Sequence, residues 1–402
     1  MLAPMMDARN ASLVLDRPGA ADASETGTHL DDLATPALVL DRDRMEANIA
    51  RMRRQLAAHG VPLRPHLKTA KSIEVARALL GSNRGPATVS TLREAEQFAS
   101  AGITDMIYAV GISADKLERA VALRRRGVDL ALLLDSVEQV QLVAEKSRAA
   151  GVALPCWIEI DCDDHRGGLK SDDPEILAVA RALDRQGVPL CGVLTHAGEA
   201  YNGTGGAEDL AAAAEQERRA AIAAAGMIRD AGLPCPGVSI GSTPTALFGQ
   251  NFEGVSEVRA GVYVFFDLVM AGLGVCRPED IAVSVLASVI GRRRDGKAII
   301  DAGWMALSRD LGRSLRDGAP HYGAVCDLDG RALPGLAVVG VNQEHGIVGT
   351  IGAAGGPVPL EIGERVRILP NHACATSAQH ERYHVVAGSR AVEAEWPRFN
   401  GW

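Results

Sequence analysis

The stretch VPLRPHLKTAKSIEVARALL, residues 61–80, contains the structural unit from which much of the chain is built. A short apolar run from Val61 ends near Lys68, and a helical pattern begins at Ser72. An apolar strand followed by a polar loop and a helix is the repeating unit of α/β proteins. Chemistry is usually placed at strand ends in such folds, so Lys68 is either a catalytic amine or a solvated surface charge. Lys71, three residues further on, is interpreted as a solvated lysine.

This unit recurs from Val61 onward, and we count eight apolar strands in the series. Continuous apolar strands that alternate with helices are typical of a parallel sheet covered on both faces. Eight repeats favour a closed (β/α)8 barrel over an open doubly wound sheet with a dinucleotide site. The open sheet is disfavoured because no Gly-x-Gly-x-x-Gly pattern follows the early strands. The predicted strands are residues 62–67, 87–91, 105–110, 130–135, 156–161, 190–196, 238–242 and 257–263.

The character of the sequence changes after Leu273. Short β-rich segments, separated by Gly, Pro and Asp turns, replace the alternation of strands and helices, which predicts a second, mostly antiparallel β domain. A strand at residues 36–41 lies outside the series of eight, and an amphipathic helix follows it at residues 45–59. We therefore predict an N-terminal arm (1–34), a barrel domain (42–270), and a β domain made of 35–41 plus 271–402.

Charge and composition exclude several classes of partner. The 402 residues include 42 Lys and Arg against 50 Asp and Glu, a formal charge of -8, which gives no electrostatic reason to bind nucleic acid or an anionic membrane. No apolar run is long enough to span a bilayer and no secretory signal is recognisable, so a cytoplasmic protein is expected. The seven cysteines are scattered, without a Cys-x-x-Cys pair, and most are expected to be buried and free.

The carboxyl ends of barrel strands meet at one face, so the polar residues there form one candidate constellation. In the turn Gly241-Ser242-Thr243, glycine would let backbone N–H groups approach a phosphate, and two hydroxyls add donors. The alternative is an ordinary turn that caps a helix. A lysine and a phosphate cradle in one barrel mouth favour pyridoxal phosphate bound as a Schiff base. Candidates at the other strand ends are His66, Ser90, Thr91, Asp161, His165, Arg166, His196, Arg259, Gly261, Val262 and Tyr263.

Two polar clusters stand out in the predicted β domain. His372 and Cys374 are two residues apart after a strand, a spacing that allows both side chains to bind an ion such as Zn²⁺. The alternative is a buried cysteine beside a hydrogen-bonded histidine. Residues 342–346, Asn-Gln-Glu-His-Gly, either complete a site or form a solvated hairpin.

Together these motifs resemble the fold-type III, alanine racemase-like pyridoxal phosphate enzymes, in the branch of D-serine dehydratases and D-threonine aldolases. The resemblance extends from about Pro36 to Trp402. It implies a (β/α)8 barrel followed by a β domain, an active site between them, and a homodimer. The motifs that carry it are RPHLKT (64–69), THAG (195–198), GSTPT (241–245), DAG (301–303), NQEHG (342–346) and PNHACAT (370–376).

The resemblance also implies a role for each candidate. Lys68 would bind the cofactor covalently, with Arg166 near its phenolic oxygen and His196 beside its ring. Arg259 matches the arginine that faces the pyridine nitrogen in alanine racemases. His372 and Cys374 match the metal pair of the family and would bind a divalent ion such as Zn, Mn, Mg or Co. Tyr263 is a further cofactor-binding residue, and the residues that would hold the phosphate are Gly241, Ser242, Thr243, Gly261 and Val262.

A His-x-Cys metal pair resembles the dehydratases of this branch, as do residues 258–267 and 301–306. The implied reaction converts a 3-hydroxy-D-amino acid, of the D-threo-3-hydroxyaspartate, D-serine or D-threonine type, to a 2-oxo acid and ammonia. The alternative within the branch is an aldolase that cleaves Cα–Cβ and releases glycine and an aldehyde. A third possibility is a non-catalytic pyridoxal phosphate carrier, which the β domain disfavours. Arg309 and His345 are candidates for binding a substrate carboxylate.

Overall fold

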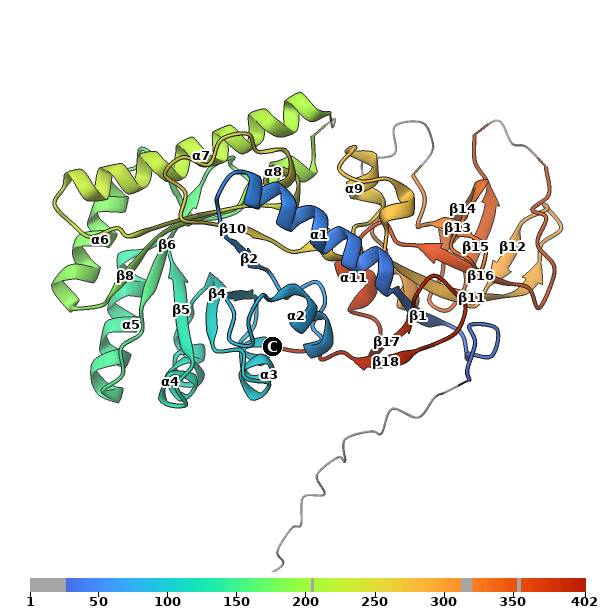
Figure 1. Ribbon diagram of the computed structural model, residues 1–402, viewed down its shortest axis with the longest axis horizontal. Helices are drawn as coiled ribbons and strands as arrows, with labels where there is room; N and C mark the ends of the chain where they lie inside the picture. Colours follow the sequence, from blue (N-terminus) through green and yellow to red (C-terminus); the bar gives the residue numbers. More distant parts are fainter. Residues whose placement is uncertain (1–26, 204–205, 312–319, 353–355) are drawn as a thin grey trace, which may run out of the picture.

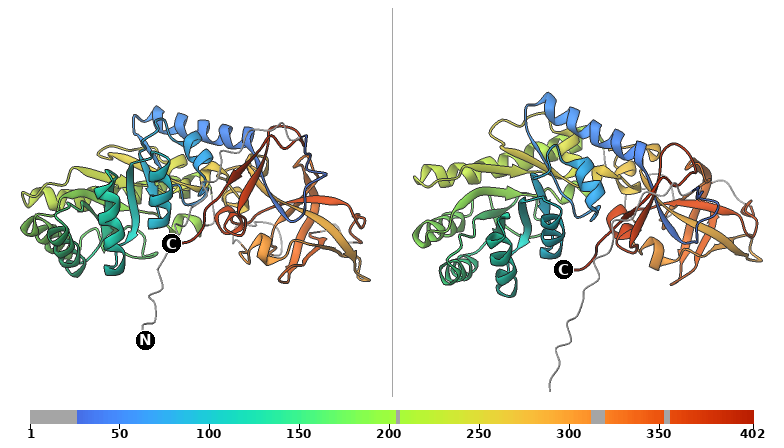
Figure 2. Two further views of the ribbon diagram at one scale, coloured as in Figure 1. Left: turned by 90° about the horizontal axis from the view of Figure 1, so that it is seen from below. Right: turned by 60° about the horizontal axis from the view of Figure 1, so that its bottom comes forward.

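The computed structural model describes residues 27–203, 206–311, 320–352 and 356–402. Most of the predicted N-terminal arm therefore lies outside the described residues. Two lobes stand side by side, one of alternating strands and helices and one of strands (Figures 1 and 2). No helix in the described part of the chain combines the length and apolar character needed to cross a membrane.

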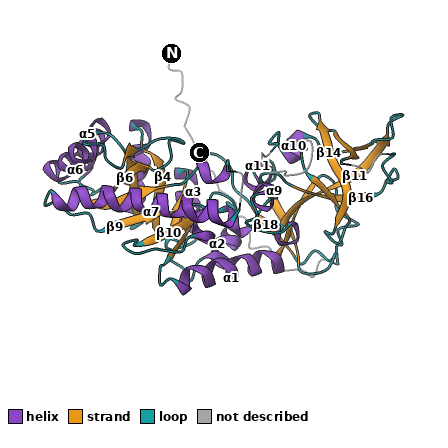
Figure 3. Cartoon of the chain, turned by 90° about the horizontal axis from the view of Figure 1, so that it is seen from above, coloured by secondary structure: helices purple, strands orange, loops and turns teal. Residues whose placement is uncertain are grey.

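The first lobe is the predicted (β/α)8 barrel. Its strands are parallel and follow the order β2-β10-β9-β8-β6-β5-β4-β3, and a bridge between His66 and Thr88 joins the two ends of this order. The helices surround the strands (Figure 3). The strands are β2 (Leu63–Pro65), β3 (Ala87–Val89), β4 (Asp105–Gly111), β5 (Asp129–Leu134), β6 (Cys156–Asp161), β8 (Leu190–Thr195), β9 (Gly237–Ile240) and β10 (Glu257–Ala260), with β7 (Leu169–Lys170) paired to β6. The helices are α2 (Ile73–Leu79), α3 (Leu92–Ser100), α4 (Leu117–Arg125), α5 (Val137–Ala150), α6 (Glu175–Gln186), α7 (Ala207–Asp230) and α8 (Thr243–Phe248).

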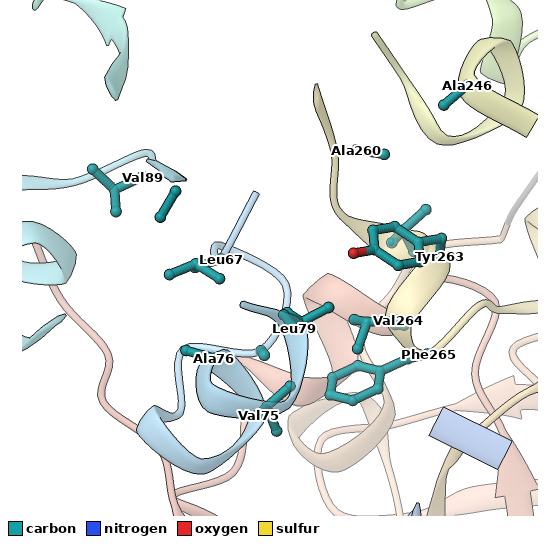
Figure 4. Packing of buried hydrophobic residues seen from close by; sticks show 14 of the residues in the cluster. Leu67, Val75, Ala76, Leu79, Val89, Ala246, Ala260, Tyr263, Val264 and Phe265 are labelled. Atoms are coloured by element: carbon teal, nitrogen blue, oxygen red, sulfur yellow. The ribbon is translucent and has the colours of Figure 1, made fainter. Parts of the chain in front are cut away.

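The eighth barrel strand ends earlier than predicted. The sequence predicts a strand over 257–263, but the pairing with β2 stops at Ala260, and residues 262–264 form a 3₁₀ turn. Tyr263 and the next two residues are fully buried and pack among apolar side chains beside α2 (Figure 4). The apolar character that suggested a longer strand therefore reflects burial in the core.

Helix α1 (Arg42–Ala58) connects the two lobes. It begins three residues before the predicted start because Asp41 accepts a hydrogen bond from the backbone N–H of Arg44 and caps the helix. The predicted apolar face is buried, at Met45, Ile49, Met52 and Leu56.

The second lobe is a mostly antiparallel sheet in the order β12-β15-β14-β13-β16-β11-β1-β17-β18, and β12 also pairs with β11. Strand β1 (Ala37–Asp41) pairs antiparallel with β11 and parallel with β17, so the N-terminal strand lies inside this sheet. The fold predicted from the sequence, a (β/α)8 barrel followed by a mostly antiparallel β domain, is confirmed. The remaining elements are β11 (Val283–Arg292), β12 (Ala298–Ile300), β13 (Ala324–Cys326), β14 (Ala332–Val341), β15 (Gly346–Thr350), β16 (Arg365–Leu369), β17 (Arg382–Val386), β18 (Ala394–Pro397), α9 (Leu268–Gly272), α10 (Trp304–Leu307) and α11 (Ala373–Ser377).

Candidate active site

A cavity of about 590 Å³ opens at the carboxyl ends of the barrel strands, and both lobes contribute to its walls. Its volume lies in the range of small-molecule and cofactor sites. The predicted site residues that line it are Lys68, Arg166, His196, Gly241, Ser242, Arg259, Gly261, Val262, His372 and Cys374. Side chains in the wall without a predicted role include Glu159, Tyr201, Asp267 and Asp310.

Lys68 is half-buried in the loop after β2. Burial, more than any other influence, lowers the pKa of its amine, and the charges of Arg166 and Arg259 act in the same direction. Cys374 opposes this shift. A lysine with a lowered pKa holds more of the free amine, the form that reacts with carbonyl groups and accepts protons.

Lys71 is not the solvated lysine that the sequence suggests. Its ammonium group lies 3.3 Å from the carboxylate of the fully buried Glu94. Its backbone has φ +45, in the left-handed region that non-glycine residues seldom adopt. The backbone N–H of Ser90 also donates to Glu94, so this carboxylate joins the Lys68 loop to the end of β3.

His196, at the end of β8, is a neutral imidazole. Its Nδ1 lies 2.9 Å from the carbonyl oxygen of Gly241, which can only accept, so Nδ1 carries the proton. Burial first, and the charge of Lys68 second, lower the pKa of His196 to about 3. A flat, uncharged ring on the cavity wall is suited to lie beside a heteroaromatic ring.

Arg259 lines the cavity and is almost fully buried. One guanidinium nitrogen donates to Ser239 Oγ at 2.7 Å and another to the Thr195 carbonyl oxygen. Burial lowers the pKa of Arg259 to about 10, so it keeps its charge at neutral pH. Arg166 lies in the loop after β6, and its side chain also reaches the cavity wall.

The Gly241-Ser242-Thr243 turn combines both interpretations of its sequence. Ser242 caps α8, with its hydroxyl accepting from Thr245 N–H, while Thr245 Oγ1 accepts from Ser242 N–H. Gly241 has φ +134, and a side chain there would overlap the Arg259 backbone. Thr243 N–H donates to the Tyr201 hydroxyl at 3.2 Å. The turn is thus a helix cap whose first two residues, Gly241 and Ser242, also line the cavity.

Glu217 on α7 organises this turn, although no motif in the sequence points to it. Its fully buried carboxylate accepts from the N–H groups of Ala197 and Gly241, each at 2.9 Å, and from Thr245 Oγ1 at 2.7 Å. Glu217 therefore joins the loop after β8, which carries His196, to the turn after β9. An acidic residue in an alanine-rich helix gives no signal of such a role, because its partners are distant in sequence.

Two predicted cofactor residues, Thr243 and Tyr263, lie behind the cavity wall. Tyr263 N–H donates to Thr243 Oγ1 at 3.2 Å, so Tyr263 joins the segment after β10 to the turn after β9. The Tyr263 ring is buried in the core, and its hydroxyl has no hydrogen-bond partner among the described residues. At Gly261 a β-carbon would lie 3.1 Å from the His66 carbonyl oxygen. A glycine here therefore lets the backbone after β10 approach the Lys68 loop closely.

These residues fit pyridoxal phosphate. The cavity brings a lysine of lowered pKa, a neutral imidazole and two arginines into one wall. A glycine turn at a helix N-terminus is also present, and such turns are suited to a phosphate group.

His372 and Cys374 come from the β-domain side, at the N-terminus of α11. Cys374 Sγ lies 3.2 Å from Thr69 Oγ1, next to Lys68 in sequence, so the two lobes meet at this contact. Burial alone would raise the pKa of the Cys374 thiol, but hydrogen bonds from His372 and Thr69 and the charge of Lys68 lower it. His372 Nδ1 lies 2.8 Å from a carboxylate oxygen of Asp310, which fixes the imidazole and leaves Nε2 for a second contact.

An imidazole nitrogen and a thiol of lowered pKa are a donor pair that suits Zn²⁺ and related ions. Asp310 accepts from His372, as outer partners of metal-binding histidines often do. Within the described residues, no group of three or more His, Cys, Asp and Glu side chains is arranged to hold a metal.

Other polar candidates from the sequence have local roles. Asp161 accepts from two backbone N–H groups of the following loop, and His165 pairs with Glu199 at 2.7 Å. Thr91 caps α3, whereas Ser90 does line the cavity and lies 3.3 Å from His66. Residues 342–345 connect β14 to β15 and are exposed, which agrees with the alternative of a solvated hairpin. Neither Arg309 nor His345 is among the cavity-lining residues.

The fold and the site define an alanine racemase-like protein, and comparison with known proteins agrees. Residues 40–269 match the family model of the alanine racemase N-terminal domain, and residues 282–386 match that of a putative serine dehydratase domain. The chain belongs to the alanine racemase-like family, in the branch with D-serine dehydratases and D-threonine aldolases, which confirms the resemblance seen in the sequence.

Within this family, the chain is 53% identical to D-threo-3-hydroxyaspartate dehydratase of Delftia sp., over 92% of this chain and 98% of that protein. The solved structure of that enzyme superposes with a TM-score of 0.89 at 52% identity, covering 93% of this chain and 100% of that one. A D-threonine aldolase of Arthrobacter sp. is 27% identical, over 93% of this chain and 94% of its own length.

Proposed function

We propose that the chain is a pyridoxal phosphate- and divalent metal-dependent lyase that converts a 3-hydroxy-D-amino acid to a 2-oxo acid and ammonia. The observation that carries this proposal is the 3.2 Å contact between Thr69 Oγ1 and Cys374 Sγ. It places the Lys68 loop of the barrel beside the His-x-Cys pair of the β domain, and both line one cavity. The similarity to D-threo-3-hydroxyaspartate dehydratase supports elimination as the reaction.

Pyridoxal phosphate, when bound, supplies an electron sink for the substrate Cα. Lys68 would hold the cofactor and then accept the Cα proton at Nζ, a task helped by its lowered pKa. Gly241, Ser242, Gly261 and Val262 would face the phosphate, supported from behind by Thr243 and Tyr263.

Three further residues would position the ring and balance its charge. Arg166 would face the phenolic oxygen, and the neutral His196 would lie beside the ring. Arg259 would remain a cation near the pyridine nitrogen, because its pKa of about 10 keeps it protonated at neutral pH.

His372 and Cys374 would hold the divalent ion, which supplies a Lewis acid for departure of the β-hydroxyl as hydroxide. Asp310 would keep the His372 ring oriented through its 2.8 Å hydrogen bond. A related solved structure supports this assignment, since it is of a cysteine-to-alanine mutant of D-threo-3-hydroxyaspartate dehydratase in the metal-free form. The unsaturated amine left after elimination hydrolyses to a 2-oxo acid and ammonia.

Product analysis tests the proposal. The purified protein, with cofactor and Zn²⁺ or Mn²⁺, is incubated with D-threo-3-hydroxyaspartate, D-serine and D-threonine, and ammonia, 2-oxo acid and glycine are assayed separately. Equal amounts of ammonia and 2-oxo acid without glycine are expected. Glycine with an aldehyde would replace the dehydratase by an aldolase, and a protein that binds cofactor but forms no product would be a carrier.

We also infer a homodimer in the cytoplasm. Family likeness supports the dimer, and the composition supports the location. Light scattering of the purified protein tests the dimer, because it measures the mass of the particle in solution.

A further inference from the structure

The C-terminal residues return from the β domain to the barrel. After β18 the chain runs back and ends against the first lobe (Figure 1). Phe399 N–H donates to the Lys71 carbonyl oxygen at 3.0 Å, and the Phe399 ring packs edge-on against Phe98 at 5.0 Å between centroids. The segment therefore lies against the loop that carries Lys68.

Arg398 lies at the start of this return and is only 8% exposed. Its Nε donates to the Ala70 carbonyl oxygen at 3.0 Å and to the Tyr383 hydroxyl at 2.9 Å. The Tyr383 hydroxyl in turn donates to the same Ala70 carbonyl at 2.7 Å. Two buried side chains of the β domain thus hold a carbonyl two residues from Lys68.

The other end of the same guanidinium holds α11. Nη1 donates to the carbonyl oxygens of Ser377 and, at 2.9 Å, of His380, at the point where the helix ends. A cation is stabilising there because the last carbonyls of a helix have no partner within it. The first turn of α11 carries Cys374, three residues before Ser377.

We propose that Arg398 is a positioning residue that sets the distance between the Lys68 amine and the Cys374 thiol across the boundary of the two lobes. The rigid, planar guanidinium reaches both carbonyl groups at once, whereas an ammonium group is a single point charge. This inference rests on the roles of Lys68 and Cys374 given under Proposed function. It adds that the geometry between them depends on a residue outside the cavity wall.

Arg398→Met tests this, because methionine keeps much of the apolar stem and removes every donor. Bound cofactor is expected to change less than about threefold, since the barrel alone supplies its predicted contacts. Affinity for Zn²⁺, measured by back-titration after chelation of the holoenzyme, is expected to fall about tenfold or more. The kcat is expected to fall roughly 10²-fold, with little change in KM, because the reacting groups are misplaced after binding.

Tyr383→Phe is a milder variant, since it keeps the ring and removes one hydroxyl contact to Ala70. It should show the same pattern with smaller changes. Arg229→Met is the matched control: Arg229 also donates twice to a carbonyl, that of Cys235, and neither residue lines the cavity. It should leave kcat and Zn²⁺ affinity within twofold.

Two outcomes would overturn the inference. One is a folded Arg398→Met protein whose kcat and Zn²⁺ affinity are within twofold of wild type. The other is a loss of activity in Arg398→Met and Tyr383→Phe that equals the loss of folded protein in a thermal melt, which is a purely structural effect. Failure of the proposed function is separate, because it would appear in the wild-type protein as the absence of 2-oxo acid and ammonia.

Discussion

The barrel side of the cavity and the β-domain side hold their residues by different means. Barrel residues such as Lys68, His196 and Gly241 follow the ends of parallel strands, so the register of one sheet places them together. Cys374 lies on a helix of five residues, α11, and His372 directly precedes it; this helix depends on distant groups such as Asp267 and Arg398 for its place. A closed sheet therefore fixes one side of the site locally, whereas the other depends on contacts between the two lobes.

The strongest test of the barrel side is Lys68→Ala. Loss of the amine removes both the cofactor attachment and the predicted base, so the visible absorbance band of the bound cofactor should vanish. Activity should fall by about 10³-fold or more. Lys146→Ala is the control, because this lysine lies on α5 and is not among the cavity-lining residues, so the band should remain. A Lys68→Ala protein that retains the band would remove Lys68 from the site.

Cys374→Ala tests the β-domain side. Because the cofactor contacts are predicted on the barrel, the absorbance band should remain while activity falls by about 10²-fold. The measurement is turnover against Zn²⁺ concentration, beside the cofactor spectrum. Cys326→Ala, in β13 and away from the cavity, should behave as wild type. Equal activity of the wild type with and without a chelator would contradict the metal role.

Substitutions of Glu217 test how far the barrel side of the cavity depends on buried hydrogen bonds within the barrel. Glu217→Ala leaves the N–H groups of Ala197 and Gly241 without their acceptor, so the free energy of unfolding should fall by about 2–4 kcal/mol. Glu217→Gln keeps an acceptor and should cost less than about 1.5 kcal/mol. Urea unfolding of the two variants measures the difference. Equal losses would show that the carboxylate does not organise the turn.

The smallest expected effect concerns His196. Its pKa is about 3 in the folded protein against an ordinary 6.5, so between these values the unfolded chain binds a proton that the folded protein does not. Stability therefore rises with pH across this window. Acidification from pH 7 to pH 5 should destabilise the wild type about 2 kcal/mol more than His196→Asn. Identical losses in both proteins, measured by urea unfolding, would mean that the imidazole is not buried as a neutral group.

The sequence predicts the barrel side of the site well because its signals are local. Each apolar strand is marked by its own residues, and the residue after it must face the carboxyl end of the barrel. That reasoning finds Lys68, Arg166, His196 and Gly241 as lining residues. It extends the last strand too far because buried residues 262–264 have the same apolar character as a strand.

The sequence by itself determined the order of strands and helices, the change from the barrel pattern to β-rich segments after Leu273, and the family motifs. What only the tertiary structure decided is which distant residues share one contact. Glu217 reaches two loops, Lys71 pairs with Glu94, and Arg398 joins Ala70 to the end of α11. The physical reason is that such hydrogen bonds form between groups tens to hundreds of residues apart. No periodic pattern in the sequence indicates these contacts, because the side chains become buried and meet their partners only when both lobes have folded.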